Sequence, residues 1–364
     1  MTGSVQRGFS VLLVTVATGF IVWKYSAGSD LDRTAFTVVA RGSVNPPLFV
    51  EGEGTHDSPW SLRIFVRESA PDPKLAPPAV FLGDDLAGIF QSSPPGPVDL
   101  AVILKNLQRL GVTKLTTSMV LAWDNPDVLE FFAVEKALTS FDSLVTSAPL
   151  SRGVEGSLLP QEFRRASLPM SAVTGDASAL PVVNRVPLPG VVLGGEKALA
   201  GFSVLESEAS SRLLPLMARW DDPQGEHRLL FSSALLAVMQ RLDLPLSGME
   251  IRPGEFLRLG PDAPVMPIDS SGYLAIPLRS SSVGFEIAAE SLIGADENLF
   301  PKDVVPPVVL RDDRTTAGVA TRAFSRAIVP AVAVMSSEEG LAPSRQYKRL
   351  PQDWEVAILA VVMG

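Results

Sequence analysis

The chain contains no cysteine. This absence excludes disulfide bonds as well as thiolate redox and metal chemistry, but it leaves the compartment open, because envelope and cytosolic proteins can both lack cysteine. Histidine is nearly as scarce, since His56 and His227 are the only two in 364 residues. Both lie in polar turn sequences, so a site built from several imidazoles would have to join distant loops. Surface histidines are the simpler interpretation, and we predict no dedicated metal site.

Positive charge is also in short supply. The chain has 31 basic and 40 acidic residues, a formal net charge of -9. Such a chain repels a phosphate backbone and has no basic stripe, which excludes nucleic acid as a partner. Common catalytic signatures are missing too: there is no G-x-S-x-G sequence, and the glycines of residues 193–201 lack phosphate-loop spacing. We therefore expect a protein that is not an enzyme, with no catalytic residues and no cofactor.

Long apolar runs are few, and the first lies near the N-terminus. The uncharged sequence GFSVLLVTVATGFIVW covers residues 8–23 and is flanked by Arg7, Lys24 and Tyr25. It is slightly shorter than the about 17 to 25 residues that span a bilayer, but the flanking side chains can reach the interface. We interpret residues 1–25 as a cytoplasmic stub and a retained transmembrane anchor. A cleaved signal peptide is the alternative, because small residues follow the run.

Charges around this run predict its orientation. Arg7 precedes it, whereas Asp30 and Asp32 follow. Basic residues favour the cytoplasmic side, so the rest of the chain is expected on the periplasmic or extracellular side of a bacterial inner membrane. A second apolar segment, residues 353–364, is too short to cross a bilayer by itself. It is either a buried terminal element or the start of a second span.

Strand and helix patterns alternate after a turn-rich, membrane-proximal lead-in over residues 26–78. AVFLGDD indicates a buried strand from Ala79, and a helix with one apolar face runs from Pro97 to Gly111. The strand TKLTTSMVLAW, a helix capped by Asn125, and the strand DSLVTSAPL follow. Such alternation is typical of a parallel sheet. Residues 79–352 are thus predicted to form one α/β domain, with a mainly parallel central sheet, flanking helices and inserted β-hairpins.

The later part of the domain is less regular. Residues 151–200 are predicted to be loops and edge strands. A strand, a polar turn at residues 221–226 and a helix from about Leu230 to Leu242 follow. EFLRLGPDAPVMPIDSSGYLAIPLR then contains two short strand patterns separated by a turn. PPVVLRDD indicates a late buried strand, and AIVPAVAVM is another apolar segment.

The order of these elements, from about Trp60 to Gln352, resembles that of CHASE2, an extracytoplasmic sensory domain of bacterial receptors. The resemblance rests on a helix LLFSSALLAVMQRL, the turn Pro267-Ile268-Asp269, the strand Gly272-Tyr273-Leu274 and a helix at Ala289-Glu290-Ser291-Leu292. PPVVLRDDRTTAG is similar to the family's strand and glycine-rich loop, and AIVPAVAVM to its closing strand. Two features differ: the family's Trp-Pro-Trp type element is absent from LAGIFQSSPPGP, and Thr117 and Ser118 stand where an acid is expected.

This resemblance implies a membrane-anchored sensory domain. It would detect an envelope-side signal, either a small molecule or an envelope protein, and pass it across the membrane. A homodimer is expected by analogy with receptors. The alternative is a structural or partner-docking envelope protein without signalling output.

The ends of the predicted strands supply the candidate binding residues. In open α/β sheets, ligands bind beyond the carboxyl ends of parallel strands. Carboxylates that converge there can bind a divalent cation or a cationic solute, with an indole as a stacking face. Alternatively, each Asp caps a local turn or faces solvent. The candidate ligand-binding residues are Asp84, Asp85, Trp123, Asp124, Arg311, Asp312 and Asp313.

Overall fold

The computed structural model describes most of the chain between residues 74 and 336. The described ranges are 74–84, 89–90, 92–188, 190–205, 214–222, 225–263, 265–274, 284–293, 299–300 and 306–336. The predicted anchor, nearly all of the lead-in and the predicted second apolar segment lie outside these ranges. Within them, no helix combines the length and the apolar character needed to cross a bilayer.

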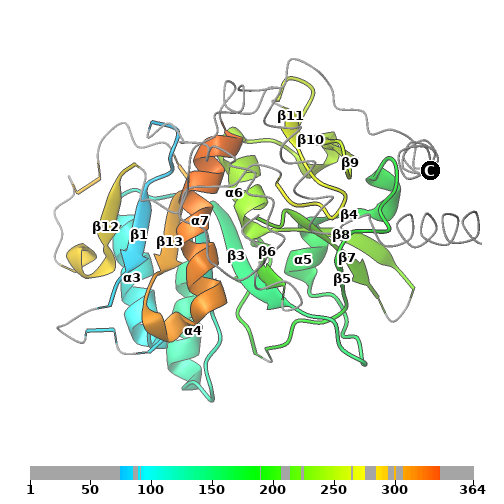
Figure 1. Ribbon diagram of the computed structural model, residues 1–364. Coiled ribbons are helices and arrows are strands. Elements are labelled where there is room, and N and C mark those ends of the chain that lie inside the picture. Colours follow the sequence, from blue (N-terminus) through cyan, green and yellow to red (C-terminus); the bar gives the residue numbers. More distant parts are fainter. Residues whose placement is uncertain are drawn as a thin grey trace, which may run out of the picture.

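The domain is built on a central sheet of six parallel strands (Figure 1), which confirms the predicted α/β class. The order across the sheet is β12-β1-β13-β2-β3-β6, and each neighbouring pair is parallel. The late strand β13 therefore lies between the two strands that open the domain. The bounds are β1 (Ala79–Leu82), β2 (Lys114–Val120), β3 (Ser143–Leu150), β6 (Leu199–Leu205), β12 (Glu286–Ala288) and β13 (Val308–Asp312).

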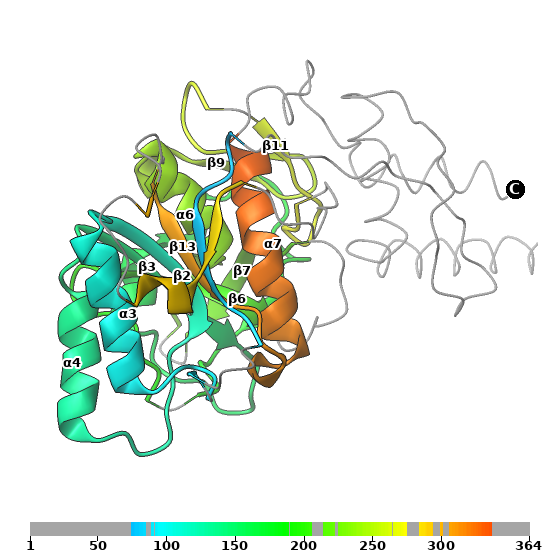
Figure 2. The same cartoon turned by 90° about the vertical axis from the view of Figure 1, so that its left-hand side faces the viewer.

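One face of the sheet is covered by α3 (Pro97–Arg109) and α4 (Val128–Leu138), as the view in Figure 2 shows. The apolar residues of α3 recur at three- and four-residue spacing, which places Leu100, Leu104 and Leu107 on one buried stripe. They pack with residues of β1 and β2 into a single apolar cluster. The predicted helix of residues 97–111 is thus confirmed.

The cap of α4 differs from the prediction. Asp127, not Asn125, is the N-cap, and its carboxylate accepts hydrogen bonds from the backbone N of Leu129 (2.8 Å) and Glu130 (3.4 Å). Asn125 instead has φ 49° and turns the chain out of β2. Asn tolerates this left-handed conformation better than most residues. Asn125 therefore forms the turn, and Asp127 caps the helix.

The other face is covered by α6 (Ser233–Leu242) and α7 (Val319–Met335) (Figure 2). AIVPAVAVM, which the family resemblance implied to be a closing strand, forms the second half of α7. This expectation was wrong because the segment is apolar on all sides, and a helix and a strand that are both fully buried look alike in sequence. Every residue from Ile328 to Met335 is buried.

Polar side chains join the sheet to α6. Ser147 Oγ lies 2.6 Å from Ser233 Oγ, and Thr116 Oγ1 donates to Gln240 Oε1 at 2.8 Å. The approach between β6 and α6 is closer still, because a Cβ added to Gly201 would lie 2.4 Å from the backbone N of Ser233. Glycine is therefore required where α6 begins against β6.

Two smaller sheets are inserted after β3. One has four strands, β4 (Ser167–Pro169), β8 (His227–Phe231), β7 (Met217–Asp221) and β5 (Val182–Val183), and the short helix α5 (Gln161–Arg165) precedes β4. The other is antiparallel and contains β9 (Glu250–Arg252), β10 (Phe256–Arg258) and β11 (Val265–Pro267). The pair β10 and β11 confirms the two strand patterns predicted within residues 255–279.

Two predicted helices have other boundaries or forms. The helix expected from about Leu230 begins at Ser233, because Leu229 to Phe231 form the end of β8 and Ser232 caps the helix through a bond from Leu235 N. The helix expected at residues 289–292 is a 3-10 turn, Ala289–Leu292, and it follows the unpredicted strand β12. A strand of three residues gives too short a pattern to be recognised in sequence.

Candidate functional site

The carboxyl ends of β1 and β13 lie side by side and bring several of the candidate residues together. In the register of this pair Leu82 faces Asp312, and Asp313 N donates to Leu82 O at 2.9 Å. Asp84 leaves β1 at the same edge where residues 311–313 leave β13. Successive residues of a strand point to opposite faces, so Arg311 and Asp312 belong to two different clusters.

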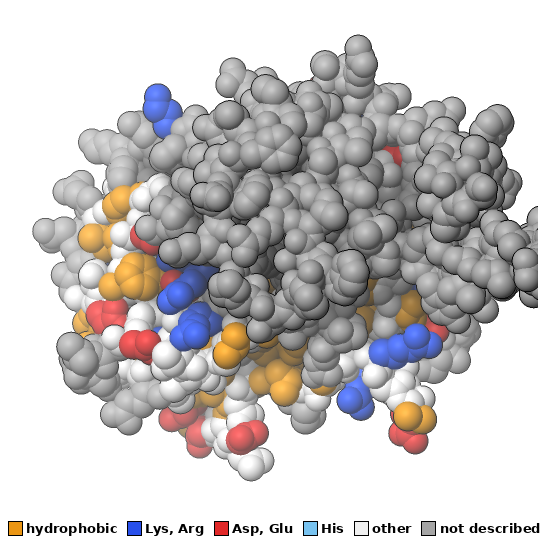
Figure 3. Space-filling model, in the orientation of Figure 1, with side chains coloured by type: hydrophobic (Ala, Val, Ile, Leu, Met, Phe, Trp, Pro, Cys, Tyr) orange, Lys and Arg blue, Asp and Glu red, His pale blue; other side chains and the backbone are white. Residues whose placement is uncertain are grey.

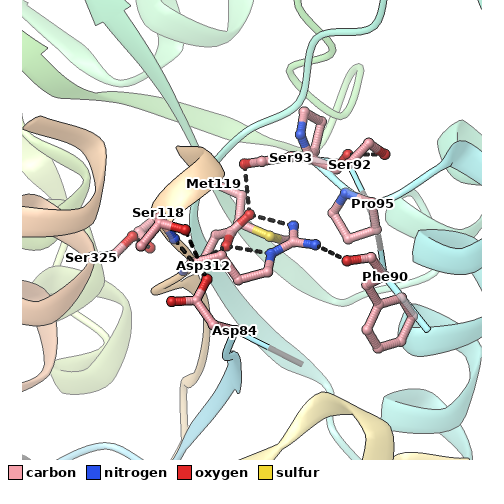
Figure 4. Close-up of polar contacts among 12 residues, drawn as sticks. Asp84, Phe90, Ser92, Ser93, Pro95, Ser118, Met119, Asp312 and Ser325 are labelled. Carbon is pink, nitrogen blue, oxygen red and sulfur yellow. Dashed lines mark hydrogen bonds and ion pairs between the residues drawn. The ribbon is translucent and has the colours of Figure 1, made fainter. Parts of the chain in front are cut away.

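Asp312 forms the first cluster, which lies on the side of α3 (Figure 4). Its carboxylate accepts from Arg314 Nε at 2.8 Å and from Arg314 Nη2 at 2.6 Å, and both side chains are buried. Ser93 Oγ donates to Asp312 Oδ2 at 2.7 Å, and Arg314 Nη1 donates to Phe90 O at 2.7 Å. Asp312 is therefore fully engaged, and it holds the loop before α3 against the turn before α7.

Asp84 performs a local capping function at the same edge. It is exposed and accepts from Thr315 N at 2.9 Å and Thr315 Oγ1 at 3.1 Å. The backbone hydrogen bond from Thr315 is the main cause that lowers the pKa of the Asp84 carboxyl. Because Thr315 begins the 3-10 turn Thr315–Ala317 that leads into α7, this bond ties β1 to the start of that helix.

Arg311 forms the second cluster, on the side of α7. Its Nη2 lies 3.0 Å from Glu286 Oε2 and 3.2 Å from Asp313 Oδ2, and the guanidinium lies 5.7 Å from the centroid of the Phe81 ring. The side chains of Arg311 and Asp313 are only 6% and 12% exposed. Arg326 of α7 approaches Asp313 Oδ2 to 4.0 Å. Burial raises the pKa of the Asp313 carboxyl, although Arg311 and Arg326 oppose this effect.

Buried side-chain atoms without a hydrogen-bond partner in this second cluster include Arg311 Nε, a donor, and Asp313 Oδ1, an acceptor. A buried polar atom left unpaired costs about 1 to 3 kcal/mol, and such atoms are rare in folded proteins. A small polar molecule that offered an acceptor to Arg311 Nε and a donor to Asp313 Oδ1 would satisfy both. Since both atoms are buried, it would reach them only if a neighbouring element moved.

Trp123 is joined to the first cluster only through the loop before α3. Trp123 Nε1 donates to Pro95 O at 2.8 Å, which fixes the indole against the loop that Ser93 joins to Asp312. Asp124 is exposed on the loop after β2. Asp85 lies outside the described residues. No group of three or more His, Asp or Glu side chains in the described part of the chain is placed to hold a metal ion.

His227 lies on a hairpin of the four-stranded sheet. His227 Nδ1 is 2.9 Å from Asp221 Oδ1 across the exposed end of the β7–β8 hairpin. His56 lies outside the described residues.

Several residues of the clusters were not among the sequence candidates, and Ser93, Arg314, Glu286 and Arg326 are examples. Arg314 follows Asp312 by two positions, and a basic residue so close to a strand-end acid was the available signal for that pair. Glu286 belongs to β12, which the sequence did not reveal, and Arg326 lies two turns into α7. The partners of Glu286 and Arg326 are distant along the chain, so no local sequence pattern predicted these two contacts.

Comparison of the chain with protein-family models, curated proteins and solved structures gave no match.

Proposed function

We propose that this chain is a membrane-anchored, extracytoplasmic sensory domain, as its resemblance to CHASE2 implies, and that a small polar ligand binds where β13 meets α7. The observation that carries the proposal is the pair of buried, unpartnered atoms Arg311 Nε and Asp313 Oδ1. They leave a donor and an acceptor within one cluster. A ligand that carries a carboxylate and an ammonium group, such as a free amino acid, has the complementary chemistry.

The same cluster is placed to act on α7. Arg326 links this helix to Asp313, and Ser118 Oγ lies 2.9 Å from the Oγ of Ser325, the residue before Arg326. A ligand that displaces Asp313 from Arg311 and Arg326 would favour a different position of α7 on the sheet. Residues 337–364, which include the predicted second apolar segment, follow this helix. A ligand shifts such an equilibrium only by binding one of the two positions more tightly than the other.

The charges of the second cluster support a small ligand of mixed charge better than a ligand of one sign. Basic, acidic and apolar side chains are interspersed over the described surface visible in Figure 3. In the second cluster itself, two carboxylates face two guanidinium groups, namely Glu286 and Asp313 against Arg311 and Arg326.

The test is a thermal-unfolding screen of the full chain in detergent with amino acids, simple amines and dicarboxylates. A ligand of the native state raises the melting temperature by mass action. The shift from an amino acid should be lost in Asp313→Asn and kept in Glu226→Gln, a control in the exposed Arg164–Glu226 pair. A panel without any stabilising compound, or a shift that survives Asp313→Asn, would contradict the proposal.

The alternative function is a docking protein without signalling output. It is favoured by apolar side chains exposed on α3 and α4, among them Phe132 and Leu129. Distance measurements between labels on α3 and on α7 separate the two functions. The sensory proposal expects the distance to change when a stabilising compound is added, whereas a docking protein keeps it constant.

A further inference from the structure

The outward faces of α3 and α4 carry an exposed apolar surface. Val128, Leu129 and Phe132 of α4 are 80%, 79% and 63% exposed, and Val98 and Val102 of α3 are also exposed. The two helices pack side by side on the sheet (Figure 2). These five exposed residues are together called the α3–α4 face. An exposed apolar patch of this kind marks an interaction site in a soluble domain.

The two helices are aligned so that their central apolar residues lie level. Both helices begin at the carboxyl edge of the sheet and run in the same direction. Gln108 Nε2 of α3 donates to Ala137 O of α4 at 2.7 Å, which sets their relative height. Counting back six residues from Gln108 and five from Ala137 reaches Val102 and Phe132. These two side chains therefore lie at about the same level, near the middle of their helices.

Charge along the α3 side of the α3–α4 face changes sign from one end to the other, from Asp99 in the first turn to Arg109 in the last. On α4, Glu130 lies in the first turn, and the exposed acid Glu135 lies beside the base Lys136 in the last turn. Lys105 adds a further exposed base beyond Val102. A partner that complements the face therefore needs a central apolar strip with its charges in the opposite order.

We propose that a second copy of this chain is that partner, bound through a twofold axis that passes beside Val102 and Phe132 at right angles to the helices. A twofold interface pairs residue i with j and j with i. Rotation about this axis places Asp99, three residues before Val102, opposite Lys105 of the second copy, three residues after Val102. In α4 it places Val128, four residues before Phe132, opposite Lys136, four residues after Phe132, whose aliphatic stem covers apolar surface. One axis thus buries the apolar strip and pairs opposite charges.

A second copy complements the face better than a lipid surface does. Acids at the first turns of both helices would be brought against anionic headgroups, which disfavours binding to a bacterial membrane. The second copy instead places the base Lys105 opposite the acid Asp99. The inference does not depend on a ligand at β13, because the α3–α4 face lies on the opposite side of the sheet from α7.

Single cysteines test the axis directly, because the natural chain has none. Val102→Cys and Phe132→Cys are made in the full chain, and oxidative cross-linking is measured in native membranes. Each variant should give a disulfide-linked homodimer, since a residue beside a twofold axis meets its own copy. The control Val154→Cys, at an exposed position in the loop after β3, should remain monomeric. Equal cross-linking of all three variants, or none in the first two, would overturn the proposal.

Charge exchange supplies a second test that does not rely on cross-linking. Lys105→Glu places like charges opposite each other and should weaken dimerisation by about tenfold in sedimentation of the detergent-solubilised chain. Combining it with Asp99→Lys restores opposite charges and should restore the dimer. A double variant as weak as the single one would contradict the antiparallel arrangement. So would a monomeric wild-type chain that binds lipid vesicles or cross-links only to another protein through Phe132→Cys.

Discussion

Asp312 and Arg314 lie two residues apart and form a buried ion pair whose Nη2–Oδ2 distance is 2.6 Å. Their side chains are only 2% and 3% exposed, and a serine hydroxyl and a backbone carbonyl occupy the remaining hydrogen-bonding positions around them. The charges of this pair are thus compensated by hydrogen bonds within the first cluster. In the second cluster, by contrast, Arg311 Nε and Asp313 Oδ1 have no hydrogen-bond partner.

We predict that Asp312→Asn is strongly destabilising. Removing one partner of a buried ion pair leaves the other charge uncompensated, which costs about 3 to 5 kcal/mol. Urea unfolding of the full chain measures the loss. The control is Glu226→Gln, because Glu226 is exposed and its ion pairs with Arg164 and Arg228 lie at the surface, where such pairs contribute about 0 to 1 kcal/mol. Similar losses in the two variants would show that Arg314 is not buried with Asp312 as described.

Asp313 should make the protein less stable as the pH rises. Burial raises the pKa of its carboxyl above the usual value of about 4, so the native state binds its proton more tightly than the unfolded state does. Stability is then lost as the pH rises from about 4 through the raised pKa. The wild-type chain should lose stability relative to Asp313→Asn over this window. A difference that grows in favour of the wild type with rising pH would contradict the burial of this group.

Asp84 should show the opposite dependence. Its pKa is lowered by the hydrogen bond from Thr315 N, so its contribution is present above about pH 4 and is lost as the pH falls through the lowered pKa. Asp84→Asn should therefore be less stable than the wild type at neutral pH, with the difference closing at low pH. Unfolding curves for both proteins at several pH values check the sign. A difference independent of pH would exclude the ionised carboxylate as the cap.

Gly201→Ala should be destabilising because of backbone contact rather than helix or strand preference. The new Cβ would lie 2.4 Å from Ser233 N and 2.5 Å from Ser233 Cα, so α6 must shift away from β6. Overpacking of this kind costs about 1 to 3 kcal/mol. Gly248→Ala is the matched control, because its nearest neighbour would be Leu259 O at 3.9 Å. A loss no larger than that of the control would argue against the close approach of α6.

The sequence allowed the sheet to be predicted where strands and helices were long and periodic. The βαβ unit around α3 follows from Leu100, Leu104 and Leu107 at helical spacing between two buried strands. Strand β12 was missed because it has three residues, and α7 was misread because its second half is buried on all sides. Burial of that kind removes the periodicity that distinguishes a helix from a strand.

The sequence predicted which edge of the sheet the candidate residues occupy, because that follows from the direction of the strands. It did not predict the contacts that these residues make. Parallel strands deliver their following residues to one edge, which correctly grouped Asp84 with Arg311, Asp312 and Asp313. The division of these residues between two faces depends on the register of β1 and β13. The partners Ser93, Glu286 and Arg326 depend on contacts between distant segments, for which the sequence offers no local signal.

The central claim is that this α/β body lies outside the bacterial inner membrane and is held there by its first residues. The most direct test uses a single cysteine at the exposed position Val154 and a membrane-impermeant maleimide on spheroplasts. Thr2→Cys, in the predicted cytoplasmic stub, is the matched control. The account predicts that Val154→Cys is labelled equally in intact and lysed spheroplasts, whereas Thr2→Cys is labelled only after lysis. Labelling of Val154→Cys only after lysis would contradict it.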